Sequence, residues 1–257
     1  AFMTGKLAKM GVEEPWLPEV CTGIEALGSY RERIVTVAIG DNQASFLGAA
    51  GNEKNTLLVN MGTGGQISVL SDQYFTAEGI EARPFLQGAY LLAGSSLCGG
   101  KAYALLEKFF REFMKAATGQ EEPLYKTLEK LARDGKASCV GKEEKQRLQI
   151  ETTFDGTRVH PEQTGSITNL STDNFTPAAF VYRTLEGMSR ELYQMYQTIQ
   201  NGTGMQIKRM IESGNGLRKN PVLCEIVEEM FGAKLALAEC EEEAATGAAL
   251  SSMQQDE

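Results

Sequence analysis

The order of strand-like and helix-like segments constrains this chain more than any other feature. Three apolar runs rich in β-branched residues predict neighbouring strands early in the chain, at 55–61, 66–70 and 89–93. Two later runs, 206–211 and 234–238, predict strands that alternate with helices. Because strands separated by helices pair in parallel, the sequence predicts an antiparallel meander extended by parallel strands.

Apolar residues at helical spacing account for much of the remaining chain. The expected helices are 42–50, 100–117, 120–134, 177–199, 221–231 and 242–253. The aromatic residues of 100–117 are expected in the core. A short helix and an irregular connection are expected within 1–33, and a buried strand at 34–39. A meander continued by strand–helix units is the ribonuclease-H-like lobe, so we expect an α/β fold with a mixed sheet and flanking helices.

Charge and cysteine usage exclude several classes of protein. The 257 residues carry 34 acidic and 25 basic side chains, a formal net charge of −9. Nucleic acids and anionic membranes require a basic face, so neither is expected as a partner. No window has the roughly 18 apolar residues of a membrane span, and 1–9 lacks the apolar core of a signal peptide. Five cysteines and the single His160, expected at the surface, have no zinc-site spacing and fit reduced thiols in the cytoplasm.

A glycine-rich turn, Gly62-Thr63-Gly64-Gly65, stands between the first two predicted strands. Successive backbone N–H groups and a threonine hydroxyl can form a concave site for phosphate in such a turn. The alternative is a tight hairpin whose glycines only supply positive φ. Taken alone, the turn favours the structural interpretation.

Asp41 follows the strand expected at 34–39. A carboxylate at this place can accept the proton of an attacking hydroxyl during phosphoryl transfer. The alternative is an N-cap for the helix 42–50, a position that aspartate favours. The two roles are compatible, because a cap fixes the side chain.

Two further glycine loops open helices. The N–H groups of Gly99-Gly100 face either a phosphate or only the loop. Ser213-Gly214-Asn215-Gly216, with Asn220 nearby, either lets a flat ring approach the backbone or simply forms a short strand–helix loop. The run Glu241–Glu243 is expected to be a solvated helix N-terminus. Together, the three glycine loops favour a nucleotide site.

In this order the segments resemble the FGGY carbohydrate kinases, and within them the sedoheptulokinases, over about residues 1–253. The segments that carry the resemblance are Gly40–Gln43, Asn60–Gly65, Ser95–Gly100, Gly156–Pro161, Ser213–Asn220 and Glu243–Ala249. The family shares the two-lobed fold of the actin-like ATPases and sugar kinases. Its adenosine segment has adjacent glycines where this chain has Gly214-Asn215.

The resemblance implies a kinase that moves a phosphoryl group from ATP to the primary hydroxyl of sedoheptulose or a related ketose. It gives Asp41 the role of catalytic base, and Asp41 and Asn42 the contact with the sugar. The implied nucleotide contacts are Gly62, Thr63, Gly64, Gly65 and Gly100 for phosphate, and Gly214, Asn215 and Asn220 for adenosine. Mg²⁺ arrives with ATP, so no metal site of the protein is implied.

The family's first phosphate motif, Asp-x-Gly-Thr, appears nowhere in the chain, and family members are roughly twice as long. We therefore expect 39–257 to be the C-terminal ATP-binding lobe. Residues 1–38 are expected to be a remnant of the N-terminal sugar-binding lobe with exposed apolar surface, and the chain alone to be inactive. The alternatives are xylulose or another polyol as substrate, or a non-catalytic binding module on the same fold. A homodimer stays open.

Overall fold

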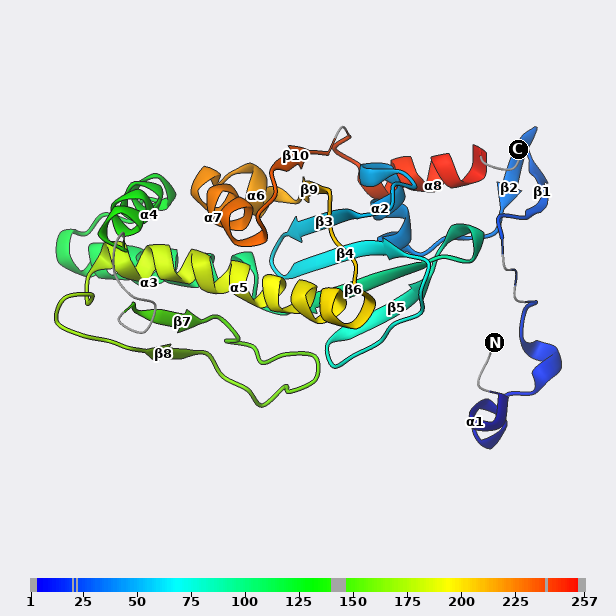
Figure 1. The fold of residues 1–257 in the computed structure, drawn as a ribbon, viewed down its shortest axis with the longest axis horizontal. Coiled ribbons are helices and arrows are strands. Elements are labelled where there is room, and N and C mark those ends of the chain that lie inside the picture. The colour runs from blue at the N-terminus through cyan, green and yellow to red at the C-terminus, as the bar shows by residue number, and fades with distance from the viewer. Residues whose placement is uncertain (1–3, 20, 22, 140–146, 239, 254–257) are drawn as a thin grey trace.

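The computed structural model describes residues 4–19, 21, 23–139, 147–238 and 240–253. Its centre is a six-stranded sheet in the order β10-β9-β3-β4-β6-β5, with helices on both faces (Figure 1). The strands of this sheet are β3 (Thr56–Met61), β4 (Gly65–Ser71), β5 (Ile80–Pro84), β6 (Tyr90–Ser96), β9 (Arg209–Ser213) and β10 (Leu235–Leu237). The main helices are α2 (Asp41–Ala50), α3 (Gly100–Thr118), α4 (Tyr125–Cys139), α5 (Pro177–Thr203), α6 (Asn215–Arg218), α7 (Pro221–Phe231) and α8 (Glu243–Met253).

The topology of the sheet is the predicted one. β3, β4, β6 and β5 form an antiparallel meander, and β9 pairs in parallel with both β3 and β10. The α/β fold with a mixed sheet and flanking helices is therefore confirmed. β5 was missed, because Glu81 and Arg83 interrupt its apolar pattern at the edge of the sheet, where they pair with each other at 2.9 Å.

Alternate residues of the central strands face two separate cores. Leu57 and Ile67 belong to the core beneath α5, whereas Leu58 and Leu70 belong to the core beneath α2. The long helix α5 contributes an apolar stripe of Val181, Leu185, Met188, Leu192, Tyr196 and Ile199. This strand-and-helix layering fixes the ends of β3, β6 and β9 relative to one another.

Two glycines allow α2 and α8 to touch backbone to backbone. A Cβ atom at Gly48 would collide with the carbonyl of Glu243, and a Cβ atom at Gly247 would collide with the carbonyl of Ala44. Only glycine permits so close an approach. The contact holds the first residue of α8 next to the sheet, where it reaches the loop after β9.

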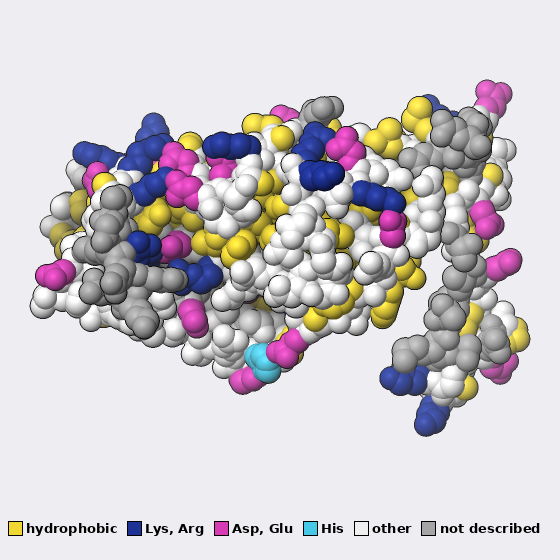
Figure 2. Space-filling view, viewed as in Figure 1, with side chains coloured by type: hydrophobic (Ala, Val, Ile, Leu, Met, Phe, Trp, Pro, Cys, Tyr) yellow, Lys and Arg dark blue, Asp and Glu magenta, His cyan; other side chains and the backbone are white. Residues whose placement is uncertain are grey.

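The prediction of a buried strand at 34–39 is wrong. β2 (Arg33–Thr36) pairs only with β1 (Ala26–Tyr30) in a separate two-stranded sheet, and the Ile34 side chain is 63% exposed. No second layer covers this hairpin among the described residues, so its apolar run faces solvent. Exposed apolar surface within 1–38 was expected and is confirmed, notably at Trp16 and Leu27. The segment that contains α1 (Thr4–Lys9) stands apart from the body of the molecule, whereas β2 lies near α8 (Figure 1 and Figure 2).

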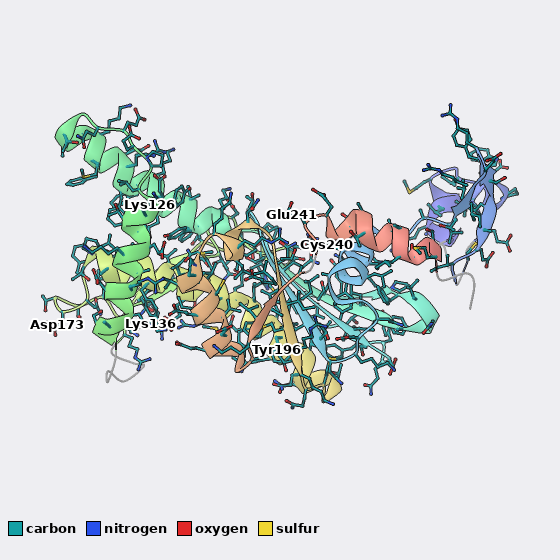
Figure 3. All side chains as sticks on the ribbon, turned by 90° about the horizontal axis from the view of Figure 1, so that it is seen from above. Lys126, Lys136, Asp173, Tyr196, Cys240 and Glu241 are labelled. Carbon is teal, nitrogen blue, oxygen red and sulfur yellow. The ribbon has the colours of Figure 1, made fainter. Side chains whose placement is uncertain are left out.

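The prediction that the aromatic residues of α3 lie in the core is only partly correct. Tyr103 and Phe110 pack against the core beneath α5. Phe109 and Phe113 are each 65% exposed. Figure 3 shows why, since α3 and α4 (labelled at Lys126) extend to one side of the sheet and only one flank of α3 meets other elements. Of the helices described, none combines the length and hydropathy that crossing a membrane requires.

Candidate functional site

Three loops that are distant in the sequence meet at the end of β3. They follow β3, β6 and β9, and their glycines touch the same stretch of backbone. A Cβ atom at Gly100 would lie 2.5 Å from the carbonyl oxygen of Gly62. Cβ atoms at Gly214 and Gly216 would lie 2.7 and 2.6 Å from the carbonyl oxygen of Met61. These approaches are shorter than any real Cβ contact, so the loops meet because side chains are absent.

Hydrogen bonds hold the first two of these loops together. The N–H of Gly100 donates to the carbonyl of Gly62 at 2.9 Å, and the N–H of Lys101 donates to the carbonyl of Thr63 at 3.0 Å. The N–H of Gly100 is therefore engaged within the protein, so the prediction that it faces a phosphate is wrong. Gly100 still borders the cavity between the loops.

The structural alternative for the β3–β4 turn was that its glycines supply positive φ, and this explanation is wrong. Neither Gly62, Gly64 nor Gly65 has a positive φ. Instead, a Cβ atom at Gly64 would lie 2.6 Å from the carbonyl oxygen of Ser96. Close packing against the end of β6, rather than turn conformation, is what requires glycine here. The antiparallel hairpin itself is confirmed by the pairing of Met61 with Gly65.

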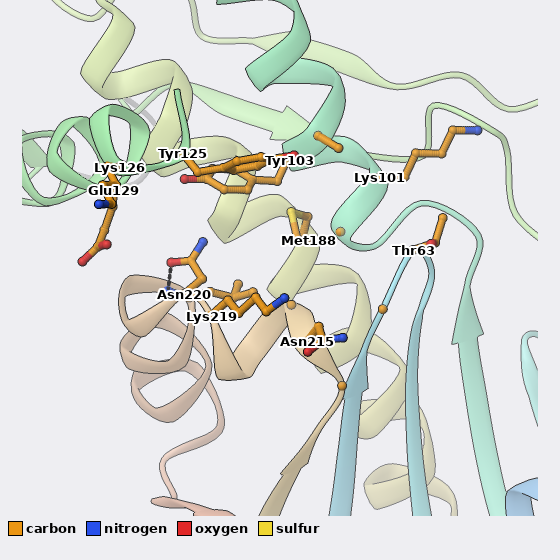
Figure 4. A pocket seen from close by; sticks show the side chains of 16 residues that line it. Thr63, Lys101, Tyr103, Tyr125, Lys126, Glu129, Met188, Asn215, Lys219 and Asn220 are labelled. Carbon is orange, nitrogen blue, oxygen red and sulfur yellow. Dashed lines mark hydrogen bonds between the residues drawn. The ribbon is translucent and has the colours of Figure 1, made fainter. Parts of the chain in front are cut away.

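The meeting point of the loops borders a cavity of about 1050 Å³, close to the upper end for small-molecule sites (Figure 4). The predicted nucleotide residues that line it are Gly62, Thr63, Gly100, Gly214, Asn215 and Asn220. Gly64 and Gly65 do not line the cavity. Gly65 is buried in β4, where a Cβ atom would lie 3.2 Å from Leu192. Most of the predicted phosphate and adenosine contacts thus share one cavity.

Several lining residues were missed from the sequence. They come from α3, α4, α5, α7 and the loop before α7, and they include Lys101, Tyr103, Tyr125, Lys126, Glu129, Met188, Lys219 and Leu223. Lys101 directly follows Gly100, and Lys219 lies within the segment 213–220, so position along the chain could have indicated both. The residues of α4 carry no such signal, because only the packing of α4 brings them to the cavity.

The cavity joins cationic groups to an aromatic pair. Lys101, Lys126 and Lys219 outnumber the single carboxylate of Glu129 in its lining, although the whole chain has a net charge of −9. The rings of Tyr103 and Tyr125 lie 5.9 Å apart at 44°. Burial raises the pKa of Tyr103 to about 12, so its phenol stays protonated. An anion with a flat apolar part fits this lining.

Asn220 and Asn215 both line the cavity, but the Asn220 side chain is held by a hydrogen bond and the Asn215 side chain is exposed. Asn220 is buried and caps α7, since its Oδ1 accepts a hydrogen bond from the N–H of Leu223 at 3.1 Å. Asn215 is exposed and begins α6 directly after Gly214, whose φ is +86°. The side chain of Asn215 is therefore available to a ligand, whereas Asn220 Oδ1 is already used.

Asp41 and Asn42 do not line the cavity. Asp41 is the first residue of α2 and Gly40 is the N-cap, so the N-cap interpretation of Asp41 is wrong. The exposed carboxylate accepts hydrogen bonds from the backbone and side-chain N–H groups of Asn42, at 2.8 and 3.2 Å. Asn42 Oδ1 in turn accepts from Gln66 of β4 at 2.8 Å. A polar chain therefore holds Asp41 against the strand that begins next to the glycine turn.

Glu243 was expected to be solvated but is a structural anchor. It accepts hydrogen bonds from Ser213 at 3.1 Å and from Arg218 at 2.9 Å, and its side chain is only 14% exposed. Glu241 and Glu242 are exposed, as expected. Because Glu243 begins α8, the α2–α8 contact fixes the loop after β9, which forms the floor of the cavity.

Glu191 of α5 is hydrogen-bonded to the end of β6, where the loop before α3 begins. Ser96 donates a hydrogen bond to Glu191 Oε2 at 2.7 Å and accepts one from the N–H of Cys98 at 3.3 Å. Glu191 Oε1 is buried without a hydrogen-bond partner in the described part of the chain. Burial raises the pKa of Glu191, opposed in part by the Ser96 hydroxyl.

We expect Glu191→Gln to change the pH dependence of stability. Because folding raises the pKa of Glu191, its contribution is fully present below the ordinary glutamate pKa and is lost as pH rises through the folded value. The variant should thus gain stability relative to the wild type, in urea unfolding, as the pH rises above the ordinary glutamate pKa. Glu228→Gln is the control with the opposite sign, because a hydrogen bond from Lys234 lowers the pKa of Glu228. If the difference in the free energy of unfolding between the wild type and Glu191→Gln is the same at every pH, this role of Glu191 is contradicted.

Comparisons with known proteins agree with this geometry. The model of the FGGY family of carbohydrate kinases, C-terminal domain, matches residues 57–254. A ligand-bound xylulose kinase from Lactobacillus acidophilus has a similar fold, with a TM-score of 0.79, 15% identity and coverage of 99% of this chain and 51% of that one. Glycerol kinase from Plasmodium falciparum, with ADP, gives a TM-score of 0.68 and 17% identity over 93% of this chain and 48% of that one.

A gluconate kinase from Lactobacillus acidophilus is similar to the same extent, with a TM-score of 0.79 and 15% identity over 96% of this chain and 50% of that one. No curated protein sequence matches this chain. The chain spans between 48% and 51% of the length of these solved kinases. It belongs to the FGGY family of carbohydrate kinases, whose C-terminal domain it contains.

Proposed function

We propose that this chain is the ATP-binding lobe of a cytoplasmic sugar kinase and that it also carries the catalytic base. The observation that carries the proposal is the convergence of three glycine loops on one cavity lined by lysines and tyrosines. Backbone contact between loops leaves room for a large flat ligand, and a lining with three lysines suits a ligand that carries negative charge. ATP has both parts.

The two ends of the cavity suit the two ends of the nucleotide. Thr63 lies at the end formed by the β3–β4 turn and α3, which we assign to the phosphates together with Gly62 (Figure 4). The opposite end, with Tyr125 and Asn220, we assign to adenosine. The buried Gly65 acts only through the shape of the turn. Mg²⁺ would enter as part of the substrate, held by phosphate oxygens as is usual for this ion.

The catalytic base we propose is Asp41. Its carboxylate is exposed and is held by the polar chain through Asn42 and Gln66. As the sugar hydroxyl attacks the γ-phosphorus of ATP, its proton passes to Asp41, and the bond between the γ-phosphorus and the ADP oxygen breaks. Asn42 contacts the sugar in this proposal. Water exclusion would come from closure of a second lobe over this face.

The sugar and the second lobe also belong to the proposal. Residues 1–38 would be part of the sugar-binding lobe, and 39–257 the ATP-binding lobe. The exposed hairpin of β1 and β2 supports this, because it offers apolar residues such as Ile34 to a neighbour. Sedoheptulose is proposed from the resemblance to sedoheptulokinases through 150–220, which includes the segment 156–161. The structurally similar xylulose, gluconate and glycerol kinases keep other polyols as alternatives.

Nucleotide binding by the chain tests the first part of the proposal. Isothermal titration should detect ATP binding, and Lys219→Glu should weaken it about tenfold, because it reverses a charge in the cavity lining. Lys208→Glu is the matched control, since Lys208 is exposed outside the cavity and the net charge changes equally. A chain that binds no nucleotide would favour the alternative of a non-catalytic module. Equal loss in both variants would place the nucleotide elsewhere.

Asp41→Asn tests the second part, in the two-lobed protein and with a panel of ketoses and polyols. We expect kcat to fall about 10²–10⁴-fold, the usual contribution of a general base, while ATP affinity stays unchanged. Gln43→Glu, next to the site on the same helix, controls for local charge. An Asp41→Asn variant with wild-type kcat would exclude Asp41 as the base. Phosphorylation of sedoheptulose by the present chain alone would contradict the assignment of two lobes.

A further inference from the structure

Lys101 has a partner that the proposed nucleotide would have to displace. Its backbone N–H is bonded to Thr63, which places the residue directly above the β3–β4 turn. Lys101 belongs to the cavity lining, and its side chain extends past Thr63, away from the tyrosine pair (Figure 4). Its Nζ lies 2.9 Å from Asp155 Oδ1 and 2.7 Å from Asp155 Oδ2. A cation at the phosphate end of the cavity is therefore held by a carboxylate of the protein itself.

Asp155 belongs to a loop that reaches this place from another part of the fold. The loop, residues 152–165, joins β7 (Gln149–Glu151) to β8 (Ser166–Thr168). It is tied to the edge of the main sheet by His160 Nε2 and Glu78 Oε1, 2.8 Å apart. The hydrogen bond that the imidazole donates to Glu78 raises the pKa of His160. The loop thus stays anchored at one point when its contact with Lys101 changes.

The Lys101–Asp155 ion pair contributes little to stability, so a ligand can displace Asp155 from Lys101 at small cost. The two side chains are 43% and 38% exposed, and ion pairs so open to water contribute little to folding. Its position also differs from that of the other cationic groups, because Lys126 and Lys219 lie across the cavity from Thr63 (Figure 4). Lys101 is the lysine of the cavity lining that stands beside the turn.

We propose that Lys101 is the residue that binds the terminal phosphate of the nucleotide, and that Asp155 holds its ammonium group until the phosphate arrives. The inference rests on the proposed function. A phosphate and a carboxylate present similar anionic oxygens, so either can accept from the same ammonium group. Nucleotide binding then breaks the ion pair and frees Asp155, which makes the 152–165 loop sensitive to the presence of the γ-phosphate.

The first test compares ATP and ADP. Lys101→Met should raise the Kd for ATP about tenfold, the effect of losing one strong charge-assisted contact, and should change the Kd for ADP by less than about threefold. Lys101→Arg should restore most of the affinity. Lys108→Met is the control, because Lys108 lies on the same helix outside the cavity and pairs with Glu112. Thermal unfolding of each variant confirms that it is folded.

The second test uses a variant that should change the ATP affinity in the opposite direction. Asp155→Asn should tighten ATP binding about threefold, because Lys101 no longer has to leave a competing carboxylate. Glu78→Gln, which alters the anchor of the same loop without touching Lys101, should leave the affinity unchanged. A pair that is merely structural predicts weaker binding, or none, for Asp155→Asn as for Lys101→Met.

The outcomes separate the inference from the proposed function. If the wild type binds ATP and Lys101→Met binds it equally well, the inference is overturned and the nucleotide site stands. Weaker binding by Asp155→Asn would also overturn it. If the wild type binds no nucleotide, both fail. Loss of ATP affinity in Lys101→Met, with a gain in Asp155→Asn, supports the exchange.

Discussion

Backbone-to-backbone contact around the end of β3 is the constraint on which the rest of the site depends. The carbonyls of Met61 and Gly62 are approached by three glycines from the loops after β6 and β9, at distances that no Cβ atom allows. β3 can serve as this hub because it lies between β4 of the antiparallel meander and the parallel β9. The loops that leave these strands therefore end at one edge of the sheet. A cavity opens there because the loops have little side chain with which to fill it.

The two faces of the sheet contribute different chemistry at this edge. The face of α3, α5 and α7 carries the cavity with its lysines and tyrosines. The face of α2 and α8 carries Asp41, tied through Asn42 to Gln66 of β4. Gln66 directly follows Gly65, so the proposed base is tied, through Asn42, to the strand that begins at the glycine turn. Glu243 of α8 links the faces from the other side, through its hydrogen bonds with Ser213 and Arg218. In the proposed function, nucleotide and sugar meet across the tip of a single hairpin.

Sequence reasoning predicted what is encoded locally. Apolar runs and helical spacing revealed the antiparallel meander and its parallel extension, and the glycines revealed the three loops, because both follow from the needs of the nearby backbone. It failed where a partner surface decides the outcome. An apolar run predicts burial but not the element that covers it, so β2 and the Phe109–Phe113 flank of α3 were placed in a core. Tyr125 and Glu129 were missed because only the packing of α4 brings them to the cavity. The exchange partner of Lys101 lies more than fifty residues away, beyond any local pattern.

The central claim is that a nucleotide occupies the cavity with its base near the tyrosine pair. Photoaffinity labelling with 8-azido-ATP, followed by peptide mapping, tests it most directly. The reactive group sits on the base, so the predicted labelled peptides contain Tyr103 of α3 or Tyr125 of α4, and excess ATP suppresses the labelling. Labelling that ATP does not suppress, or that falls only on the β1–β2 hairpin or on α8, would contradict the account.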